Sequence, residues 1–246
     1  MQIDALVRYL NEYLQVSAFQ DYAPNGLQVA GTPEVKRIVT GVTACQSLIE
    51  AAIEYKADAL LVHHGYFWKN EPAPIVGMKQ KRIKSLLMND INLLGYHLPL
   101  DAHPNVGNNA MLGQLWELDD ITPVSGLVRL GRLREPMAIE QFIERVATSL
   151  NRPPLHLPGG PEMVQTIAWC SGGAQNSIQT AIDWQADVYI SGEVSEQTTH
   201  QAAESGIHYL AAGHHATEMF GIQALGAHLK AEFGLEVHFV DTQNPV

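Results

Sequence analysis

The sequence has few of the features that mark secreted or membrane proteins. Its 246 residues include only two cysteines, Cys45 and Cys170, which lie far apart, so neither a disulfide framework nor a thiolate metal site is expected. No apolar run approaches the roughly 20 residues that a transmembrane helix requires. The first residues include Asp4 and no continuous apolar core, which is not the pattern of a signal peptide. These absences favour a cytoplasmic protein.

Basic residues are also scarce. The chain has 15 Lys and Arg against 26 Asp and Glu, a formal net charge of −11. Non-specific nucleic-acid binding needs a basic surface that displaces counterions, so it is not expected here, although net charge does not exclude a local basic patch. Ser171–Gly173 is a glycine-rich stretch that could present backbone amides to a phosphate, but the full dinucleotide and P-loop patterns are missing.

What the chain does contain is typical of a folded α/β protein. Apolar residues make up 46% of it and charged residues 17%. Near the N-terminus, apolar residues recur at helical spacing and predict an amphipathic helix. They are Ile3, Leu6, Val7, Leu10 and Leu14.

Two stretches of the chain resemble each other without a gap, Ile38–Gly65 and Ile167–Val194. Each reads as a strand, a turn of small residues, a helix and a second strand, which is a βαβ unit with parallel strands. Another helix and strand follow each unit. Any two βαβ units look alike, but the ungapped register favours an internal duplication.

We therefore expect two related α/β halves with mostly parallel βαβ units, residues 1–125 and 126–246. Thr122–Pro136 is the predicted boundary between them. Arg152–Pro161, rich in proline and glycine, is expected to be a loop within the second half.

Histidines cluster where the predicted strands end. His63 and His64 follow one strand, and His97 and His214 follow the strands that come third in each half. Each of the latter two precedes a carboxylate by four residues, Asp101 in the first half and Glu218 in the second. The carboxyl ends of parallel strands are where open α/β sheets build their sites. Glu193 occupies the repeat position of His64 and is a further candidate.

Imidazoles and carboxylates together suit Zn, Fe, Mn, Co or Ni rather than calcium. Five such ligands exceed the three of a usual catalytic zinc site, and two carboxylates could bridge two ions roughly 3.5–4 Å apart. Each segment alone has a structural explanation: GHHATE could be a helix start with Thr217 as its cap, and HLPLD could be a turn. Their conjunction favours a metal site.

Three aromatic residues follow the histidine pair, Tyr66, Phe67 and Trp68. They could stack a nucleobase, but aromatic side chains pack cores and interfaces as often. Upstream, Asp21–Gln28 contains Pro-Asn-Gly, which is a turn signature.

Taken together, LLVHHGYFW, INLLGYHLPLDAHP, SGEVSEQ, AAGHHATE and DYAPNGLQV resemble the NGG-one-interacting-factor-three-like family over nearly the whole chain. Bacterial members of that family are labelled type 2 homologues of GTP cyclohydrolase one. The resemblance implies two α/β halves, a ring-shaped homohexamer (a toroid) and a dinuclear metal site between the halves. By motif position the ligands of the two divalent ions fall on His63, His64, Asp101, His214 and Glu218.

The resemblance places His97 beside the metals rather than among their ligands. We interpret His215 as a structural residue. The expected function is a metal-dependent hydrolase that acts on a nucleotide-like or phosphorylated small molecule through a metal-bound water. His97 or Glu193 would move the proton. The alternatives are a non-catalytic metal-binding ring that serves as a scaffold or binds a partner, and redox chemistry with iron. GTP ring opening is not expected, because the chain lacks a Cys/His zinc cluster.

Overall fold

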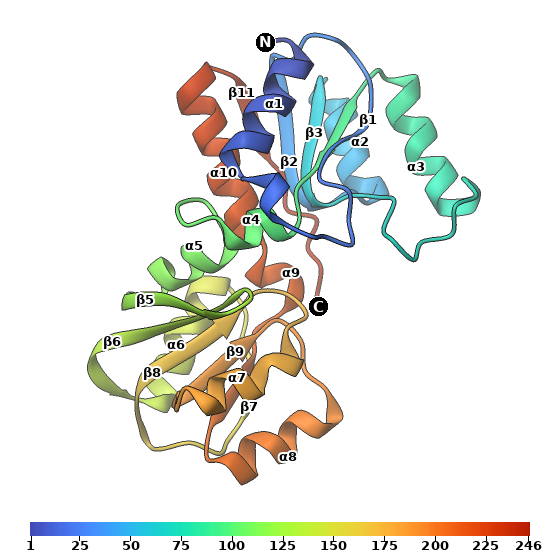
Figure 1. Cartoon of the computed structure of the whole chain (residues 1–246). Helices are drawn as coiled ribbons and strands as arrows, with labels where there is room; N and C mark the ends of the chain where they lie inside the picture. Colours follow the sequence, from blue (N-terminus) through green and yellow to red (C-terminus); the bar gives the residue numbers. More distant parts are fainter. The chain divides into compact units, whose positions relative to one another are not determined.

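The computed structural model describes residues 1–246, which fold as two compact α/β units (Figure 1). Unit 1 comprises Met1–Gly107 and Gly221–Gln243, and unit 2 comprises Asn108–Phe220 and Asn244–Val246. None of the helices combines the length and the apolar character that a membrane span requires.

Unit 1 is built on a five-stranded sheet with the strand order β1-β4-β3-β2-β11. All neighbours are parallel except β1, which pairs antiparallel with β4. The strands are β1 Gly26–Val29, β2 Arg37–Thr43, β3 Ala59–His64, β4 Asn92–Gly95 and β11 Glu236–Phe239. The central strands are buried almost throughout, as expected for parallel strands covered on both faces.

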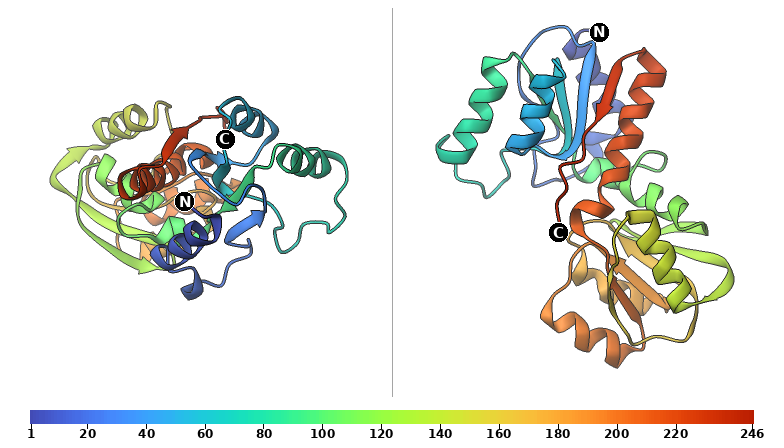
Figure 2. Two further views of the ribbon diagram at one scale, coloured as in Figure 1. Left: turned by 90° about the horizontal axis from the view of Figure 1, so that it is seen from above. Right: turned by 180° about the vertical axis from the view of Figure 1, so that it is seen from behind.

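Helices cover both faces of this sheet. α2 and α3 lie on one face and α10 on the other, together with α1 (Figure 2); Tyr13 of α1 stacks on His228 of α10 with ring centroids 4.3 Å apart. The elements are α1 Ile3–Tyr13, η1 Val16–Ala18, α2 Gln46–Glu54, α3 Gly77–Met88, α4 Leu98–Ala102 and α10 Met219–Phe233. The predicted N-terminal helix is confirmed, and it buries Leu6 and Leu10.

Unit 2 is built on a six-stranded sheet with the order β5-β6-β8-β9-β10-β7. Its strands are β5 Leu118–Ser125, β6 Val128–Ala138, β7 Leu155–Leu157, β8 Met163–Cys170, β9 Val188–Ser191 and β10 His208–Ala211. Its helices are α5 Asn108–Leu115, α6 Ile139–Leu150, η2 Gln175–Ser177, α7 Ile178–Asp183, α8 Glu196–Ser205 and α9 His214–Thr217.

Alternating side chains of the central strands serve the two faces of this sheet. Trp169 and Ile190 pack with Phe142 of α6 in one buried cluster. Tyr189 and Tyr209 pack in another, against α7 and α8. Both units therefore have sheets covered by helices on both sides, with β2-β3-β4 and β8-β9-β10 as their parallel runs.

The sheets are mixed, which departs from the expectation of mostly parallel βαβ units. In unit 2, β5, β6 and β7 are all paired antiparallel. Thr122–Pro136, expected to be the boundary, lies in the β5–β6 hairpin, and the expected loop Arg152–Pro161 contains β7. Most of β5 is exposed, charged residues interrupt β6, and β7 spans only three residues, so none of them has the apolar run of a central strand. Pro123 is tolerated because β5 is an edge strand.

The expected halves, 1–125 and 126–246, do not coincide with the compact units. The C-terminal strand β11 pairs parallel with β2, so the last strand of the chain completes the sheet of unit 1. The backbone groups on one side of β2 thus obtain their hydrogen-bond partners from a segment some 200 residues later in the chain. Sequence similarity between the two halves cannot reveal that the last strand of the second half joins the sheet of the first.

The cluster around Phe142 is expected to dominate the stability of unit 2. Phe142 is fully buried, so Phe142→Ala should lower the free energy of unfolding of this unit by about 3–5 kcal/mol. The measurement is thermal and urea unfolding followed by circular dichroism. Leu155→Ala, at a side chain that is 53% exposed, is the control and should cost about 1 kcal/mol or less. Equal losses for the two variants would contradict this account of the core.

Candidate metal centre

In unit 1, the candidate side chains meet where neighbouring parallel strands end. His63 and His64 are the last residues of β3, and His97 follows β4 directly before α4. β3 and β4 are hydrogen-bonded neighbours in parallel register, so their carboxyl ends share one edge of the sheet. One nitrogen from each of these three histidines lies within 4.8 Å of the others.

His63 has the orientation of a metal-binding imidazole. Its ring is buried, and its Nδ1 lies 2.9 Å from the backbone oxygen of Tyr96, to which an Nδ1–H donates. The other nitrogen, Nε2, then faces the Asp101 carboxylate at 3.5 Å. A backbone acceptor on one nitrogen fixes the tautomer and leaves the second nitrogen as a lone-pair donor.

His64 and Asp101 complete the expected ligands of unit 1. The Nδ1 of His64 lies 3.3 Å from the hydroxyl of Thr43, its neighbour on β2. Asp101 sits in the short helix α4, four residues after His97, and is buried. Both histidines thus have one ring nitrogen anchored to the sheet, as a rigid ligand requires.

His97 is held by the loop that contains Asp21 and Asn25, which the sequence predicted only as a turn. Its Nδ1 lies 2.9 Å from the Asp21 carboxylate, and its backbone N–H donates to Asn25 Oδ1 at 2.7 Å. Asp21 also accepts hydrogen bonds from Leu98 N–H and from the Asn25 amide, both at 3.0 Å. The missed signal was Asp21 itself, whose carboxylate is matched to His97 only in three dimensions.

The electrostatics of Asp21 reflect these contacts. Burial raises the pKa of its carboxyl, but hydrogen bonds from His97 and Asn25 outweigh burial and hold that pKa well below its ordinary value. Asp21 is therefore an anion at all ordinary pH values, and it fixes the orientation of the His97 ring.

Of the three aromatic residues after the histidine pair, only Trp68 lies beside these histidines. Its ring is 5.0 Å from that of His97, as is the ring of Tyr22 from the Asp21 loop. Tyr66 is buried, with its hydroxyl bonded to the backbone oxygen of Ala44 at 2.7 Å, and is a core residue. Phe67 lies under Lys79, whose Nζ is 5.0 Å from the ring centroid.

In unit 2, His214 and Glu218 are brought together with Glu193. Glu193 follows β9 and His214 follows β10, and these strands are parallel neighbours. The Nδ1 of His214 lies 2.6 Å from Glu193, and its Nε2 lies 3.2 Å from the Glu218 carboxylate. This carboxylate–imidazole pair leaves Nε2 facing a buried second carboxylate, which is the usual arrangement of a metal-binding histidine.

The same carboxylates raise the pKa of His214 to about 9. The hydrogen bond to Glu218 contributes most and outweighs burial, which lowers the pKa; Glu193 adds to the rise. Without a metal ion, His214 is therefore expected to be an imidazolium at neutral pH, with its positive charge beside the Glu193 and Glu218 side chains. A divalent cation would take over that role.

The position of Gly172 beside the candidate ligands accounts for a glycine in the stretch Ser171–Gly173. Its φ is +65°, and a Cβ at this position would lie 2.2 Å from Glu218 Oε1 and 3.2 Å from His214 Nε2. Only glycine leaves this space to the two candidate ligands. The phosphate hypothesis for Ser171–Gly173 is not supported, because the amides of Ser171 and Gly172 already donate to Asn109 and Thr217.

Two further expectations concern the GHHATE segment. Thr217 is the last residue of α9, and its hydroxyl binds the backbone of Gly172 and Gly213, so it closes the loop and does not cap the start of a helix. His215 is buried, and its backbone N–H donates to Val246 at 2.9 Å. Its neighbour His214 is the histidine of the pair that meets the carboxylates.

The donor set in each unit fits a divalent transition-metal ion. The Nε2 atoms of His63 and His214 lie 3.5 and 3.2 Å from buried carboxylates, and neither cysteine takes part in these contacts. Such mixed nitrogen and oxygen donors are chemically suited to Zn, Fe, Mn, Co or Ni. The structure therefore contains groups of residues that could hold a metal ion.

Comparison with known proteins identifies the protein family. A family model described as Duf34/NIF3 (NGG1p interacting factor 3) matches residues 1–245. The chain belongs to the Duf34/NIF3 family. Relatives in this family include proteins called GTP cyclohydrolase 1 type 2 homolog, from Yersinia pestis (52% identical over 96% of both chains) and from Escherichia coli K12 (50% identical over 100% of both).

Two solved structures have the same fold as this chain. A protein described as ybgI, of unknown function, superposes with a TM-score of 0.98 at 49% identity and full coverage of both chains. TTHA1606 from Thermus thermophilus gives a TM-score of 0.94 at 38% identity, also over both full chains. The expected family resemblance is thereby confirmed over the whole chain.

The packing at Gly172 predicts a selective effect on metal binding. Gly172→Ala should push Glu218 away from His214 and weaken metal binding at least tenfold, because the added Cβ overlaps the carboxylate. Metal affinity is measured by competition with a chromophoric chelator. The matched control is Gly173→Ala, whose Cβ would meet Glu193 at 3.4 Å, an ordinary contact. Equal affinities for the two variants would contradict the proposed role of Gly172.

The raised pKa of His214 predicts a proton-linked metal affinity. Below a pKa of about 9 a metal ion must displace a proton from His214, so affinity for a Co²⁺ probe should rise about tenfold from pH 7 to pH 8 and level off above about pH 9. Titration calorimetry in buffers of different ionisation heat counts the released protons. A flat profile over this range would show that His214 is already neutral in the metal-free protein.

Proposed function

We propose that the chain binds two divalent metal ions through His63, His64 and Asp101 of unit 1 together with His214 and Glu218 of unit 2. The observation that carries the proposal is the common geometry of His63 and His214. Each has Nδ1 against a fixed oxygen and Nε2 turned to a buried carboxylate. Membership of the Duf34/NIF3 family supports the choice of these five ligands, since all five lie in the motifs on which the family resemblance rests.

We further propose a metal-dependent hydrolase of nucleotide-like or phosphorylated small molecules. Bound divalent ions supply Lewis acidity, which lowers the pKa of water and stabilises developing negative charge. His97 is the residue for proton transfer: Asp21 anchors its Nδ1, so Nε2 is the atom that takes up and delivers the proton. Glu193 positions His214 through the 2.6 Å contact.

The name shared by the relatives does not argue for GTP ring opening in this chain. It describes them as homologues of that enzyme, and neither cysteine of this chain is among the candidate ligands. The alternative to a hydrolase is a ring-shaped homohexamer that binds metal as a scaffold or binds a partner, in line with the interaction named in the family description. The two functions differ in whether His97 affects turnover.

Metal content tests the dinuclear site. Protein purified without chelator or nickel affinity resin should contain about two ions per chain by mass spectrometry, falling to one or fewer in Asp101→Ala and Glu218→Ala, because each removes a buried carboxylate ligand. Glu144→Ala, at an exposed carboxylate of α6, is the control and should leave the content unchanged. Less than one ion in the wild type, not restored by added metal, would overturn the proposal.

Turnover separates the hydrolase from the scaffold. Wild type loaded with the native metal is screened on phosphoesters, nucleotides and cyclic amides. His97→Ala should lower kcat by about 10²–10⁴-fold while metal content stays at the wild-type level, because it removes the proton-transfer group alone. Asp21→Asn should lose activity in part. No metal-dependent turnover on any substrate class, with two ions bound, would favour the scaffold.

A further inference from the structure

Two aromatic side chains cover the imidazole of His97. The ring centroids of Tyr22 and Trp68 each lie 5.0 Å from that of His97, and their planes stand at 71° and 79° to it. Trp68 also lies 5.8 Å from the ring of His64. His97 is buried, whereas Tyr22 is 54% exposed and Trp68 is partly exposed. The two aromatic rings, which we call the aromatic platform, therefore help to bury the proposed proton-transfer group and are themselves accessible to a ligand.

Hydrogen bonds hold the loops of the aromatic platform in place. The backbone N–H of Trp68 donates to Glu71 Oε2 at 3.1 Å, and its indole Nε1–H donates to the backbone oxygen of Gly65 at 3.2 Å. The backbone N–H of Lys69 donates to the backbone oxygen of Tyr22 at 2.8 Å, which joins the two loops that carry the rings. Because the loops are tied down before a ligand binds, less conformational entropy is lost on binding.

The backbone beside Trp68 is strained. Phe67 has a φ of +65°, in the left-handed region that costs free energy for a residue with a Cβ. The Glu71 carboxylate accepts a hydrogen bond from the backbone N–H of Phe67 at 2.6 Å and pairs with Lys79 at 3.2 Å. Strain of this kind persists only where the surroundings impose it, and it is concentrated at functional sites. Its position directly before Trp68 favours a functional role for the indole ring.

The spacing of the two platform rings determines how a ligand can stack. The ring centroids of Tyr22 and Trp68 are 5.7 Å apart, and their planes are inclined by 35°. A planar ring inserted between them would need about 7 Å, twice the contact distance of about 3.5 Å between carbon atoms. A ligand ring therefore stacks on an outer face of the platform. Because each platform ring lies 5.0 Å from His97, groups attached to the ligand ring come close to the imidazole.

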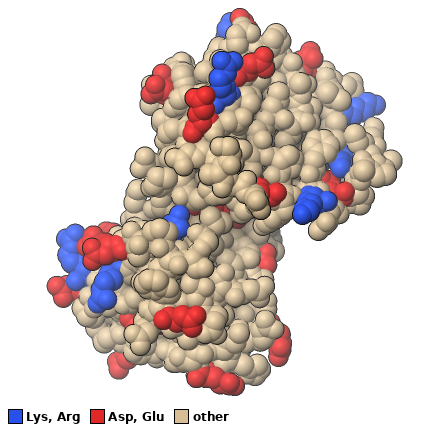
Figure 3. Space-filling model, viewed as in Figure 1, with Lys and Arg blue, Asp and Glu red and all other residues tan.

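The charges near the platform do not suit a nucleic-acid chain. Its two loops, residues 21–22 and 65–71, contain one basic residue, Lys69, against the acidic residues Asp21 and Glu71. On the face of unit 1 that Figure 3 shows, acidic side chains lie among the basic ones. Proteins that bind single strands need a basic groove along the phosphates in addition to stacking rings. A single planar ring on a small molecule needs only the platform.

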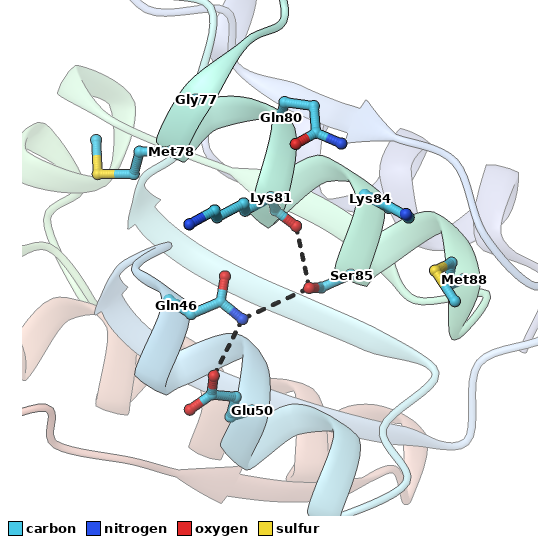
Figure 4. Close-up of a pocket in the computed structure, with 9 residues that line it drawn as sticks. All are labelled: Gln46, Glu50, Gly77, Met78, Gln80, Lys81, Lys84, Ser85 and Met88. Carbon is cyan, nitrogen blue, oxygen red and sulfur yellow. Dashed lines mark hydrogen bonds between the residues drawn. The ribbon is translucent and has the colours of Figure 1, made fainter.

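The cavity between α2 and α3 does not offer the same chemistry. Its volume is about 720 Å³, and it is lined by methionine, polar and charged side chains, among them Met78, Met88 and Lys81 (Figure 4). Neither an aromatic residue nor a candidate metal ligand lines it. A planar heteroaromatic ring has no stacking partner there, so the aromatic platform suits such a ring better.

We propose that the aromatic platform binds the planar heteroaromatic ring of a small-molecule substrate, such as the base of a mononucleotide, and places its substituents beside His97. This inference rests on the proposed function, since it assigns the substrate class of the same site. Aromatic stacking suits such rings because every base has a π face, whatever its hydrogen-bonding groups. Nucleotide-like molecules are therefore favoured over phosphorylated molecules that lack an aromatic ring.

Matched ligands test the platform on the full chain as purified. AMP and UMP are compared by titration calorimetry with ribose 5-phosphate, which has the same sugar and phosphate but no base. Both nucleotides should bind at least fivefold more tightly than ribose 5-phosphate, because stacking of one base on aromatic rings strengthens binding by about five- to 150-fold. Any contribution of metal ions to phosphate binding is common to the three ligands and cancels in the ratio.

Substitutions separate stacking from a structural role of the loop. Trp68→Ala and Tyr22→Ala should each reduce the preference for nucleotides to twofold or less. Trp68→Phe removes the indole hydrogen bond to Gly65 but keeps an aromatic ring, so it should retain most of the preference. Trp184→Ala and Tyr55→Ala, at side chains that are 50% and 44% exposed elsewhere, are the matched controls and should bind like the wild type.

Thermal melting and metal content of every variant keep the result separate from folding, and turnover keeps it separate from the proposed function. A nucleotide preference that is lost in Trp68→Ala at unchanged melting and metal content would support the inference, even if no substrate is turned over. Equal affinity of the wild type for all three ligands, or equal losses in Trp68→Phe and Trp68→Ala, would overturn it, even if the hydrolase is confirmed. Binding of a single-stranded oligonucleotide more than tenfold more tightly than AMP, lost in Trp68→Ala, would also overturn it, since the occupant would then be a nucleic acid.

Discussion

The candidate centre depends on fixing one nitrogen of each imidazole. A histidine ring can turn and can carry its proton on either nitrogen, so a ligand is formed only when something else determines both. Here a backbone carbonyl holds His63, a threonine hydroxyl contacts His64, and a carboxylate holds His214. All three partners come from strands or strand ends of the same sheet as the histidine they hold. The sheets thus supply the rigidity that metal selectivity requires.

Backbone geometry contributes as much as the side chains. Glu218 can approach His214 because Gly172 has a positive φ and no side chain, and the loop around it is closed by the hydroxyls of Thr217 and Ser191. Tyr209 donates to the backbone oxygen of Glu193 and so anchors the loop that carries this carboxylate. The loops that carry the candidate ligands are therefore hydrogen-bonded to residues of the sheet, so we expect substitutions in the core to shift these side chains.

Some elements and site residues could be predicted from the sequence and others could not, for physical reasons. Helical spacing identified α1, and strand ends followed by histidines identified the candidate ligands, because both patterns are local. The β5–β6 hairpin and β7 were missed because polar, exposed residues interrupt the apolar residues of β5 and β6, and because β7 spans only three residues. Asp21, Gly172 and the pairing of β11 with β2 escaped because each matters only through a partner distant in sequence. The internal duplication stays a prediction.

The hydrogen bonds that orient His97 favour the proposed hydrolase over a scaffold that only binds metal. A scaffold needs only ligands, yet Asp21 holds the Nδ1 of His97, which is not an expected ligand, and the loop also accepts hydrogen bonds from the backbone N–H groups of His97 and Leu98. Burying a carboxylate costs free energy unless it is hydrogen-bonded, and two of the partners of Asp21 are the His97 ring and the backbone N–H of Leu98 at the start of α4. The result is a ring with one fixed and one available nitrogen beside His63 and His64. An oriented base next to candidate ligands is what a hydrolase requires and what a scaffold could omit.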